Sequence, residues 1–524
     1  MPISFSNIPD GFRIPLYYVE IDPSKAGLPI NRMPALIVGI KIAAGNAPAD
    51  VPTPIASQAQ ADRAFGQGSE LSCMTRAFLA NNFAQELWCL PVAEGTTAAT
   101  GTITVATPPT DAGTLHLYIG GYHVPVGVAA SDTVAIVAAS IKSAIAAMPN
   151  LPVVGGTVTA GACPITCKWK GVTGNDIVLS DNYYGRVGGE IMPPGLTLTY
   201  TKMASGAGVP SFTNAISNLG EQEAEFVALG YTDSTSLTAW ETEYGFSDTG
   251  RWGWMRQHFG HIFAARRGGS PSIPDAYADL LTNFAGSRNS AQLSVLALEQ
   301  TVQSPVFEWA AAYCAKAARA LSNDPARPLQ TLNLNSMIPA PGQDRFLLTE
   351  LNSLSKAGLA TQRTLQDGVP KIARESTTAT VNLYGMSDDA YELVTTLATL
   401  ARVLRNQRQA ITSKFPRHKL ADDGTRFGPG QAIVTPKSIK AELLAQYRID
   451  EFQGLVENAT AFKNNLIVER DVNDPNRLNV LYPPDLVNQL RIFAVLAQFR
   501  LQYDRGVDIE IVGAGVPAPA VAGI

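Results

Sequence analysis

The sequence predicts an α/β protein of several domains, and three observations support this prediction. The chain has 524 residues, more than one ordinary hydrophobic core organises. Apolar runs typical of buried strands alternate with helical patterns before residue 95 and again after residue 209. Between these stretches, residues 96–208 are rich in Thr, Gly, Val and Ala and poor in charge, which favours a β-rich module inserted into the α/β domain.

The first α/β stretch is predicted to contain two buried strands and one helix. The strands are residues 33–43 (MPALIVGIKIA) and 86–92 (ELWCLPV), and the helix is residues 58–82. Ahead of them, residues 13–22 (RIPLYYVEID) are aromatic and β-branched and are predicted to form a strand with no local partner.

The inserted module contains short alternating runs such as TLHLYIGGYHVPVGV and GLTLTYTK, typical of strands, and one predicted helix at residues 132–148. The second α/β stretch follows the module. Its predicted strands are residues 225–230 and 291–298, and its predicted helices are residues 304–320 and 344–357. This alternation predicts a parallel-leaning sheet with helices on its faces.

The C-terminal section is predicted to combine helices with sheet-forming segments. Ser387 is predicted to cap a helix with Asp388 and Asp389 in its first turn, and Thr435-Pro436 to open a second helix. Runs NNLIVERD and RLNVLYP flank the turn NDPN as a hairpin. Further strands are predicted at residues 489–503 and 506–512, where apolar and polar residues alternate.

Bulk composition excludes several classes of protein. A formal net charge of −5 gives no global field for nucleic acid or an anionic membrane. Five cysteines, an odd number, do not form a disulfide framework, and no basic-then-apolar signal segment opens the chain, so a reducing cytoplasm is the expected place of synthesis. We expect no transmembrane helix, because the longest apolar runs are too short.

Catalytic and nucleotide-binding signatures are absent from the sequence. It contains no GxxxxGK[ST] phosphate loop and no GxSxG nucleophile elbow. His258 and His261 have a spacing that could place both imidazoles on one helix face, but their neighbours supply no further metal ligands, so they are interpreted as packing or hydrogen-bonding residues. Cys163 and Cys167 are interpreted as small buried residues of the module.

One segment concentrates positive charge. Residues 401–440 contain nine Lys or Arg and two acids, and such a patch favours an anionic partner. Nucleic acid is one candidate, although few aromatic residues accompany the charges. Asp422 and Asp423 could serve as general acid and base, but adjacent carboxylates before glycine more often form turns. A solvated loop between helices remains the competing interpretation.

Four stretches of the sequence resemble contractile phage tail sheath proteins of the kind found in Mu-like phages. They are SFSNIPDGFRIPLYYVEIDPSKAG near the N-terminus, GTLHLYIGGYHVPVGV and GNDIVLSDNYYG in the inserted module, and PRHKLADDGTRFGPGQAIVTP with the hairpin and final strand after it. These stretches come from all sections of the chain and contain no catalytic signature.

The resemblance implies a subunit that polymerises into a helix around a tail tube, and a sheath that shortens to drive the tube through the bacterial envelope. It implies a central α/β domain likened to the subtilisin fold without its working triad. It also implies terminal arms that add strands to neighbouring C-terminal domains. The expected layout is an N-terminal arm (1–30), a central domain (31–95 and 209–385), an outer β-rich domain (96–208), an inner assembly domain (386–503) and a C-terminal arm (504–524).

Two sets of residues are expected to serve assembly. The strand-exchange set is Arg13, Ile14, Leu16, Tyr18, Glu20, Phe499, Leu501, Val507, Ile509 and Ile511. The basic set, expected to face the tube or a neighbouring subunit, is Lys414, Arg417, His418, Lys419, Arg426, Lys437 and Lys440. Main-chain hydrogen bonds between exchanged strands would hold the subunits together, and a contact that does not close would build a helix.

The implied partners are further copies of the chain, the tail tube protein, and baseplate and tail terminator proteins. No nucleic acid and no membrane insertion are expected, and no cofactor, metal or catalytic residue. The implied location is the virion tail, assembled in the host bacterial cytoplasm.

Two other classes of function make different predictions. An α/β hydrolase-like enzyme using His418 with Asp422 or Asp423 predicts a monomer or small oligomer whose activity is lost in His418→Ala. A DNA-binding structural protein predicts salt-sensitive retention on nucleic acid. A sheath subunit predicts long tubes or rings in electron micrographs.

Overall fold

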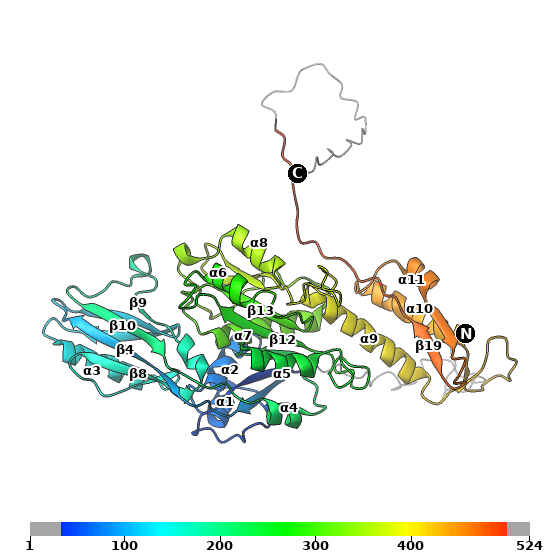
Figure 1. Cartoon of the computed structure of the whole chain (residues 1–524), viewed down its shortest axis with the longest axis horizontal. Coiled ribbons are helices and arrows are strands. Elements are labelled where there is room, and N and C mark those ends of the chain that lie inside the picture. Colours follow the sequence, from blue (N-terminus) through cyan, green and yellow to red (C-terminus); the bar gives the residue numbers. More distant parts are fainter. Residues whose placement is uncertain (1–32, 500–524) are drawn as a thin grey trace, which may run out of the picture. The chain divides into compact units, whose positions relative to one another are not determined.

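The computed structural model of the chain describes residues 33–499, which fall into two units (Figure 1). One ends at Val487 and the other begins at Asn488. The strands predicted at residues 13–22 and 506–512 lie outside the described residues.

A six-stranded sheet forms the centre of the first unit. Its order is β13-β12-β11-β1-β3-β2, and of these six strands only β2 runs antiparallel to its neighbour. The strands are β1 (Ala35–Ile40), β2 (Thr53–Pro54), β3 (Leu87–Val92), β11 (Phe226–Leu229), β12 (His261–Arg267) and β13 (Leu293–Leu298). The predicted parallel-leaning sheet is confirmed.

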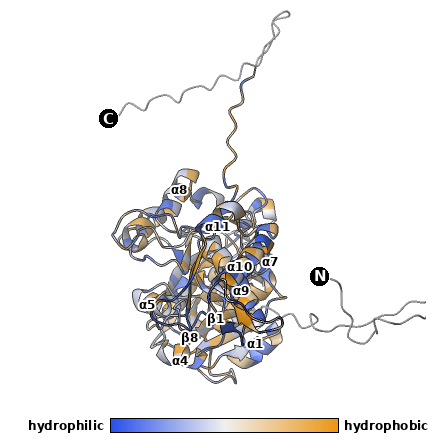
Figure 2. Ribbon diagram, turned by 90° about the vertical axis from the view of Figure 1, so that its right-hand side faces the viewer, coloured by the Kyte–Doolittle hydropathy of each residue, from blue (hydrophilic) through white to orange (hydrophobic). Residues whose placement is uncertain are grey.

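Strands from both α/β stretches of the sequence meet in this sheet. Ala35 of β1 pairs with Leu87 of β3 on one side and with Phe226 of β11 on the other. Every residue of β1, β11 and β13 is buried, as expected for parallel strands covered on both faces. Figure 2 shows strongly hydrophobic ribbon at β1.

The helix predicted at residues 58–82 is two helices, α1 (Gln58–Phe65) and α2 (Glu70–Asn81). Gly66 and Gly68 between them have φ angles of 88° and 74°, a left-handed conformation that a helix cannot contain. The Ser69 side chain then accepts a hydrogen bond from the Ser72 N–H and caps the second helix. The prediction of one helix was wrong because it passed over these two glycines.

The remaining helices of this region pack on the sheet or near it. Helix α7 packs against α2 and crosses β11 and β12. It corresponds to the helix predicted at residues 304–320 but begins at Val306 and ends at Asn323, and α8 is shorter than the helix predicted at 344–357. The helices are α4 (Thr213–Leu219), α5 (Ser234–Tyr244), α6 (Ala276–Asp279), α7 (Val306–Asn323) and α8 (Leu348–Lys356). An antiparallel pair, β14 (Thr361–Thr364) and β15 (Pro370–Arg374), follows α8.

Residues 98–204 form two small antiparallel sheets and one helix, α3 (Val134–Ala146). The sheet orders are β10-β4-β8-β7 and β6-β5-β9, and α3 packs on strands of both sheets. The strands are β4 (Ala98–Thr107), β5 (Gly113–Ile119), β6 (Tyr122–Val128), β7 (Val153–Gly155), β8 (Ala162–Lys170), β9 (Leu179–Asp181) and β10 (Thr197–Ala204). The strands and the single helix predicted here are confirmed.

This β-rich module packs against helices of the α/β region through specific contacts. The Tyr122 hydroxyl donates to Glu308 Oε1 of α7 at 2.7 Å. The Trp169 and Phe307 rings meet edge to face with centroids 5.6 Å apart. Buried side chains of both regions therefore belong to one continuous hydrophobic cluster.

Residues 394–481 contribute three helices and two short strand pairs. They are α9 (Val394–Lys414), α10 (Pro436–Phe452), α11 (Ala459–Asn465), the parallel pair β16 (Lys419–Leu420) and β17 (Ile433–Val434), and the hairpin β18 (Ile467–Arg470) and β19 (Leu478–Leu481). Thr435 caps α10 with its side chain on the Ser438 N–H, and Pro436 follows at the first helical position. The predicted start of this helix and the predicted hairpin are confirmed.

Helix α9 begins later than predicted. Residues 387–393 contain two isolated β-bridge residues, Ser387 and Leu393, and a turn between them, where the Asp388 carboxylate accepts from the Ala390 N–H at 2.9 Å; the helix starts at Val394. Asp388 therefore satisfies a local turn instead of a helix start.

The second unit is described from residue 488 to residue 499. This part of the chain forms neither helix nor strand, so the strand predicted at 489–503 is not present in the single chain up to residue 499. Hydrophobic residues recur along it (Figure 2).

Candidate assembly surface

The three arginines of α9 occupy different environments. Arg402 donates to the Ser322 carbonyl at 2.9 Å, and Arg405 binds both carboxylate oxygens of the buried Glu225. Burial raises the pKa of Glu225, and the Arg405 guanidinium opposes that shift. Arg408 is exposed. Two of the three cations therefore attach α9 to the α/β region, and the third faces solvent.

The basic set predicted from sequence divides in the same way. Lys414 forms an ion pair with Glu442, and the half-buried Lys440 donates to the Leu466 carbonyl at 2.6 Å. Lys414 is exposed despite its ion pair, and the other exposed members are Arg417, His418, Lys419, Arg426 and Lys437. In the described part of the chain none of these five forms an ion pair, and Lys419 donates to the neutral Gln431 side chain at 3.2 Å. The charge available to a partner is therefore concentrated between residues 417 and 437.

A cavity of about 660 Å³ opens beside this charged segment. Its lining includes Ile411 and Phe415 from the end of α9, Leu443 from α10, and Leu478 from the hairpin. His418 also lines it and meets the Phe415 ring edge to face, with centroids 5.2 Å apart. An apolar hollow therefore lies directly next to exposed cations.

The β18–β19 hairpin is a two-stranded sheet with both outer edges unpaired in the described residues. Ile467 pairs with Leu481, and these side chains are 50% and 59% exposed. Unpaired main-chain groups beside exposed apolar side chains form a template on which another strand can add.

Residues 488–499 present a dense series of exposed apolar side chains. These side chains are Leu490, Ile492, Phe493, Val495, Leu496 and Phe499, each at least 69% exposed. Phe499 is the one member of the predicted strand-exchange set that the structure describes, and the other nine lie outside the described residues. So much exposed apolar surface on one short segment is typical of a segment that another surface covers.

An enzyme site at His418 is not supported. Asp422 forms an ion pair with Arg470 at 3.0 Å, and Asp423 accepts from the backbone N–H of Lys437 at 3.1 Å. All three candidate catalytic side chains are exposed, and no hydrogen bond joins His418 to either carboxylate within residues 33–499. The two aspartates stabilise the loop, as the turn interpretation predicted.

His258 and His261 do not share a helix face. His261 is the first residue of strand β12, and His258 lies in the loop before it, where it pairs with Glu221 at 2.9 Å. Burial lowers the pKa of His261 to about 3, so this side chain is a neutral packing residue beside Phe263. Both therefore match the packing and hydrogen-bonding interpretation, and Cys163 and Cys167 are buried as expected.

The sequence patterns missed one exposed apolar surface, the loop at residues 381–391. Leu383 and Tyr384 are 102% and 89% exposed, and Val381 and Tyr391 line a cavity of about 780 Å³ beside them. The available signal was the apolar run VNLYGM, which lies just before the incorrectly placed start of α9.

In the described residues, no helix is both long and apolar enough to cross a membrane.

Sequence comparisons cover almost the whole chain. The Mu-like prophage FluMu tail sheath protein of Haemophilus influenzae strain Rd is 41% identical over 505 residues, which are 96% of this chain and 100% of that protein. The phage tail sheath protein central domain matches residues 205–378, and the phage tail sheath C-terminal domain matches residues 386–500.

Several solved structures are similar at low sequence identity. A sheath tail protein of Desulfitobacterium hafniense is 12% identical with a TM-score of 0.44, over 90% of this chain and 100% of that chain. A sheath tail protein of Listeria innocua is 10% identical with a TM-score of 0.46, over 88% and 93% of the two chains. The family assignment rests on the sequence matches and not on these two structures.

This chain is thus 41% identical to a tail sheath protein over nearly its whole length, and two phage tail sheath domains match it in order. The chain belongs to the phage tail sheath proteins and is a structural subunit of a contractile tail sheath, not an enzyme.

Proposed function

We propose that this subunit polymerises helically around a tail tube and that shortening of the sheath drives the tube through the bacterial envelope. The observation that best supports the proposal is the open β18–β19 hairpin, whose outer edges are unpaired within residues 33–499 and whose Ile467 and Leu481 side chains are exposed. A surface of this kind becomes stable when strands of neighbouring chains pair with it. Because the donor and the acceptor are different parts of the subunit, the contact is heterologous and can repeat without closing.

The arms are the proposed donors of these strands. Residues Arg13, Ile14, Leu16, Tyr18 and Glu20 would come from the N-terminal arm (1–30), and Val507, Ile509 and Ile511 from the C-terminal arm (504–524). Phe499 and Leu501 would contribute the strand that leads into the second arm. The exposure of the apolar residues at 488–499 supports this assignment, because a free chain would otherwise leave them in water.

The other regions have proposed roles that follow their positions in the sequence. Residues 31–95 with 209–385 would form a central domain of subtilisin-like topology, and residues 96–208 an outer domain. Residues 386–503 would form the inner assembly domain. The buried sheet supports a rigid central domain, because its strands have little freedom to rearrange.

The basic set has a proposed role in partner choice. Arg417, His418, Lys419, Arg426 and Lys437 would face the tube or an adjacent subunit, whereas Lys414 and Lys440 would hold the loop in place. The cavity next to these cations supports the proposal, because it offers apolar contact beside the charge. Charges at the rim of such a contact select the partner more than they tighten binding.

The proposed partners are copies of the chain, the tail tube protein, and baseplate and tail terminator proteins, with no nucleic acid and no membrane insertion. The proposed place of assembly is the host bacterial cytoplasm, before the subunit becomes part of the virion tail.

Negative-stain electron microscopy of the purified full-length protein tests the proposal. We expect long tubes or stacked rings, because the subunit carries both the donor and the acceptor parts of the contact. A monodisperse monomer at all concentrations and salt conditions would contradict self-assembly by this chain alone.

Deletion of residues 1–22 separates strand exchange from folding. The variant should remain a folded monomer by circular dichroism and gel filtration, yet form no tubes. Unchanged tubes would show that the N-terminal arm is not the donor. A second variant keeps the length of the arm but exchanges each of Ile14, Leu16 and Tyr18 for serine. It should also form no tubes, which would show that the apolar side chains of the arm are needed and not its length alone.

A further inference from the structure

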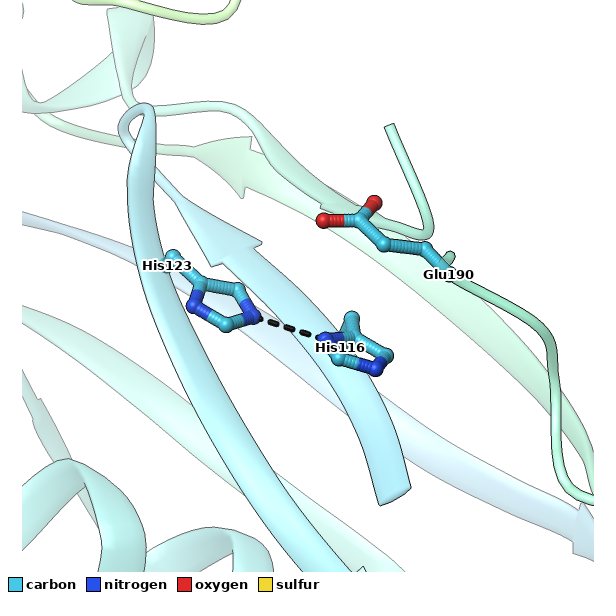
Figure 3. Close-up of side chains that lie close together, drawn as sticks. All are labelled: His116, His123 and Glu190. Carbon is cyan, nitrogen blue, oxygen red and sulfur yellow. Dashed lines mark hydrogen bonds between the residues drawn. The ribbon is translucent and has the colours of Figure 1, made fainter. Parts of the chain in front are cut away.

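Two of the five histidines in the chain lie side by side in the β-rich module, and a glutamate lies next to them (Figure 3). His116 is on β5 and His123 is on β6, and Glu190 comes from the separate segment after the turn at Arg186–Gly188. One ligand atom of each residue lies within 4.8 Å of the others. The fold of the module therefore places three side chains of metal-binding types, from three segments, at one point.

Strand register explains why the two histidines meet. In the antiparallel pair β5–β6, Tyr118 lies opposite His123 and His116 lies opposite Pro125. His116 and His123 are thus diagonal neighbours on the same face of the sheet. Their rings stack at an interplanar angle of 13°, and His116 Nδ1 lies 2.9 Å from His123 Nε2.

This separation is close to what one metal ion requires. Zinc is bound by histidine nitrogens at about 2.0–2.1 Å, so two nitrogens on a tetrahedral ion lie about 3.3 Å apart. Metal binding would replace the hydrogen bond between these nitrogens, with the loss of its proton, a separation larger by a few tenths of an ångström, and a turn of each ring toward the ion.

Glu190 is prepared to complete such a site. Its side chain is buried, its Oε1 accepts from the Tyr118 hydroxyl, and its Oε2 accepts from the Tyr184 N–H at 2.9 Å. Within residues 33–499 no Lys or Arg forms an ion pair with this carboxylate, although burying an unbalanced carboxylate is costly. A carboxylate oxygen that accepts one hydrogen bond retains a second lone pair for a metal ion.

We propose that His116, His123 and Glu190 form a binding site for a divalent transition-metal ion of the zinc class. Two imidazoles and one carboxylate are a ligand set that zinc accepts with a water in the fourth position. Calcium and magnesium favour sets composed of oxygen ligands, which argues against them here. The exposure of His123 leaves a path for the ion and for that water.

The bound ion would supply the missing counter-charge for Glu190. It would also join the β5–β6 hairpin to the segment around residues 184–190. The Tyr118 hydroxyl of β5 already donates to Glu190 across these two parts, and the Tyr184 N–H holds Glu190 within its own segment. The metal would therefore fix the fold of one end of the module and have no role in chemical conversion.

Zinc titration of the full-length protein, produced without a polyhistidine tag and treated with a chelator, tests the proposal. Zn²⁺ is added in competition with a chromophoric chelator, and Co²⁺ absorption reports the coordination geometry. Wild type should bind one equivalent of Zn²⁺ and give the intense visible bands of tetrahedral cobalt. The five buried cysteines should not contribute in the folded protein.

His123→Ala removes a metal ligand, so it should weaken Zn²⁺ binding at least tenfold and remove the cobalt bands. Loss of a residue that only hydrogen-bonds to a metal ligand already weakens metal binding by about tenfold or more. Because His123 is exposed, this variant should fold normally. Glu190→Gln should also weaken binding, and His418→Ala, which removes an exposed histidine elsewhere, should not. The proposal is overturned if wild type binds no Zn²⁺ at micromolar concentration, or if His123→Ala and His418→Ala bind equally.

Discussion

The central sheet and the β18–β19 hairpin bury their strands to very different extents. All residues of β1 and β13 are buried, whereas β18 and β19 contain no fully buried residue. The side chains of these two sheet strands are covered by other parts of the same chain. An isolated two-stranded hairpin is marginal in water, and this one packs on α10 through β18 while its outer edges stay unpaired within residues 33–499. Under the proposed strand exchange, the sheet would keep its structure within one subunit, and strands of neighbouring chains would complete the hairpin.

The two regions also have separate hydrophobic cores. The larger cluster joins the sheet, its helices and the β-rich module, and the smaller cluster joins α10, α11 and the loop at residues 455–456. The ion pair between Arg405 and Glu225 connects α9 to the sheet side. Helix α9 also contributes a buried residue to each core, Val394 to the larger cluster and Val403 to the smaller one.

Substitution of one apolar residue in each region tests this contrast most directly. Phe263 is fully buried in β12 and its ring meets Tyr313 at 5.0 Å, so Phe263→Ala should lower the free energy of unfolding by about 3–5 kcal/mol. Ile467→Ala should cost less than about 1 kcal/mol, because half of this side chain is already in water. Tube formation should nevertheless fall at least tenfold in Ile467→Ala.

Urea unfolding and quantitative electron microscopy measure the two effects. Ile136→Ala removes an equally exposed isoleucine from α3 of the module and is the matched control. It should leave both stability and tube formation unchanged. Equal loss of tubes in the Ile467 and Ile136 variants would mean that the hairpin contributes no more to assembly than the exposed surface of α3.

The connection between the two regions gives the next largest effect. Arg405→Ala leaves the buried Glu225 without its cation, and breaking such a pair should destabilise the protein by about 2–4 kcal/mol. Arg408→Ala, one turn further along the same helix and exposed, should change the free energy of unfolding by less than about 0.5 kcal/mol. Chemical denaturation of both variants compares them, and similar values would show that Glu225 is not held by Arg405.

Sequence patterns located the sheet well because its strands are buried on both faces. Runs such as ALIVGI and LSVLAL are continuous and apolar, and that pattern predicts a parallel strand. Strand β12 was missed, because its sequence HIFAARR contains one histidine and two arginines, and its neighbours suggested a helical spacing of histidines instead. The start of α9 was placed too early, because aspartates such as Asp388 and Asp389 are typical of turns as well as of helix starts.

The assembly surface was predictable only in part. The local excess of cations indicated the segment around Arg417 and Arg426. It could not show that Arg402 and Arg405 are bound within the chain, because their partners lie 80 or more residues away in the sequence. The His116–His123 pair was overlooked because its proximity depends on hairpin register and on Glu190, 67 residues beyond His123. Local periodicity contains no information about such distant partners.

Buried carboxyls of the α/β region should make the stability of the protein depend on pH. Burial raises the pKa of Glu70, Glu299 and Glu308 to about 7, and all three belong to the α/β region. A carboxyl whose pKa is raised by folding stabilises the folded state below its unfolded pKa of 4.5, and this contribution is lost as pH rises through 7. The free energy of unfolding should therefore decrease between pH 5 and pH 8.

Glu70→Gln should remove about 2 kcal/mol of that decrease. The glutamine oxygen can still accept from the Tyr231 hydroxyl and the Ile40 N–H, both of which donate to Glu70 Oε2. Urea unfolding at the two pH values measures the difference. The exposed Glu94 is the control, and Glu94→Gln should keep the wild-type pH dependence. An unchanged slope in Glu70→Gln would mean that Glu70 is ionised in the folded protein.

The exposed cations of residues 417–437 should have the smallest effect, and it should be on assembly alone. Arg417→Gln removes a charge that has no ion-pair partner in residues 33–499, so the free energy of unfolding should stay within about 0.5 kcal/mol of wild type. Tube formation should fall about two- to fivefold at low ionic strength, and the difference should disappear near 0.5 M salt, where exposed charges are screened. Lys356→Gln, an exposed cation on α8, is the control and should assemble normally. If both variants assemble like wild type at low salt, partner choice does not depend on Arg417, and the open hairpin alone would distinguish the assembly region from the closed sheet.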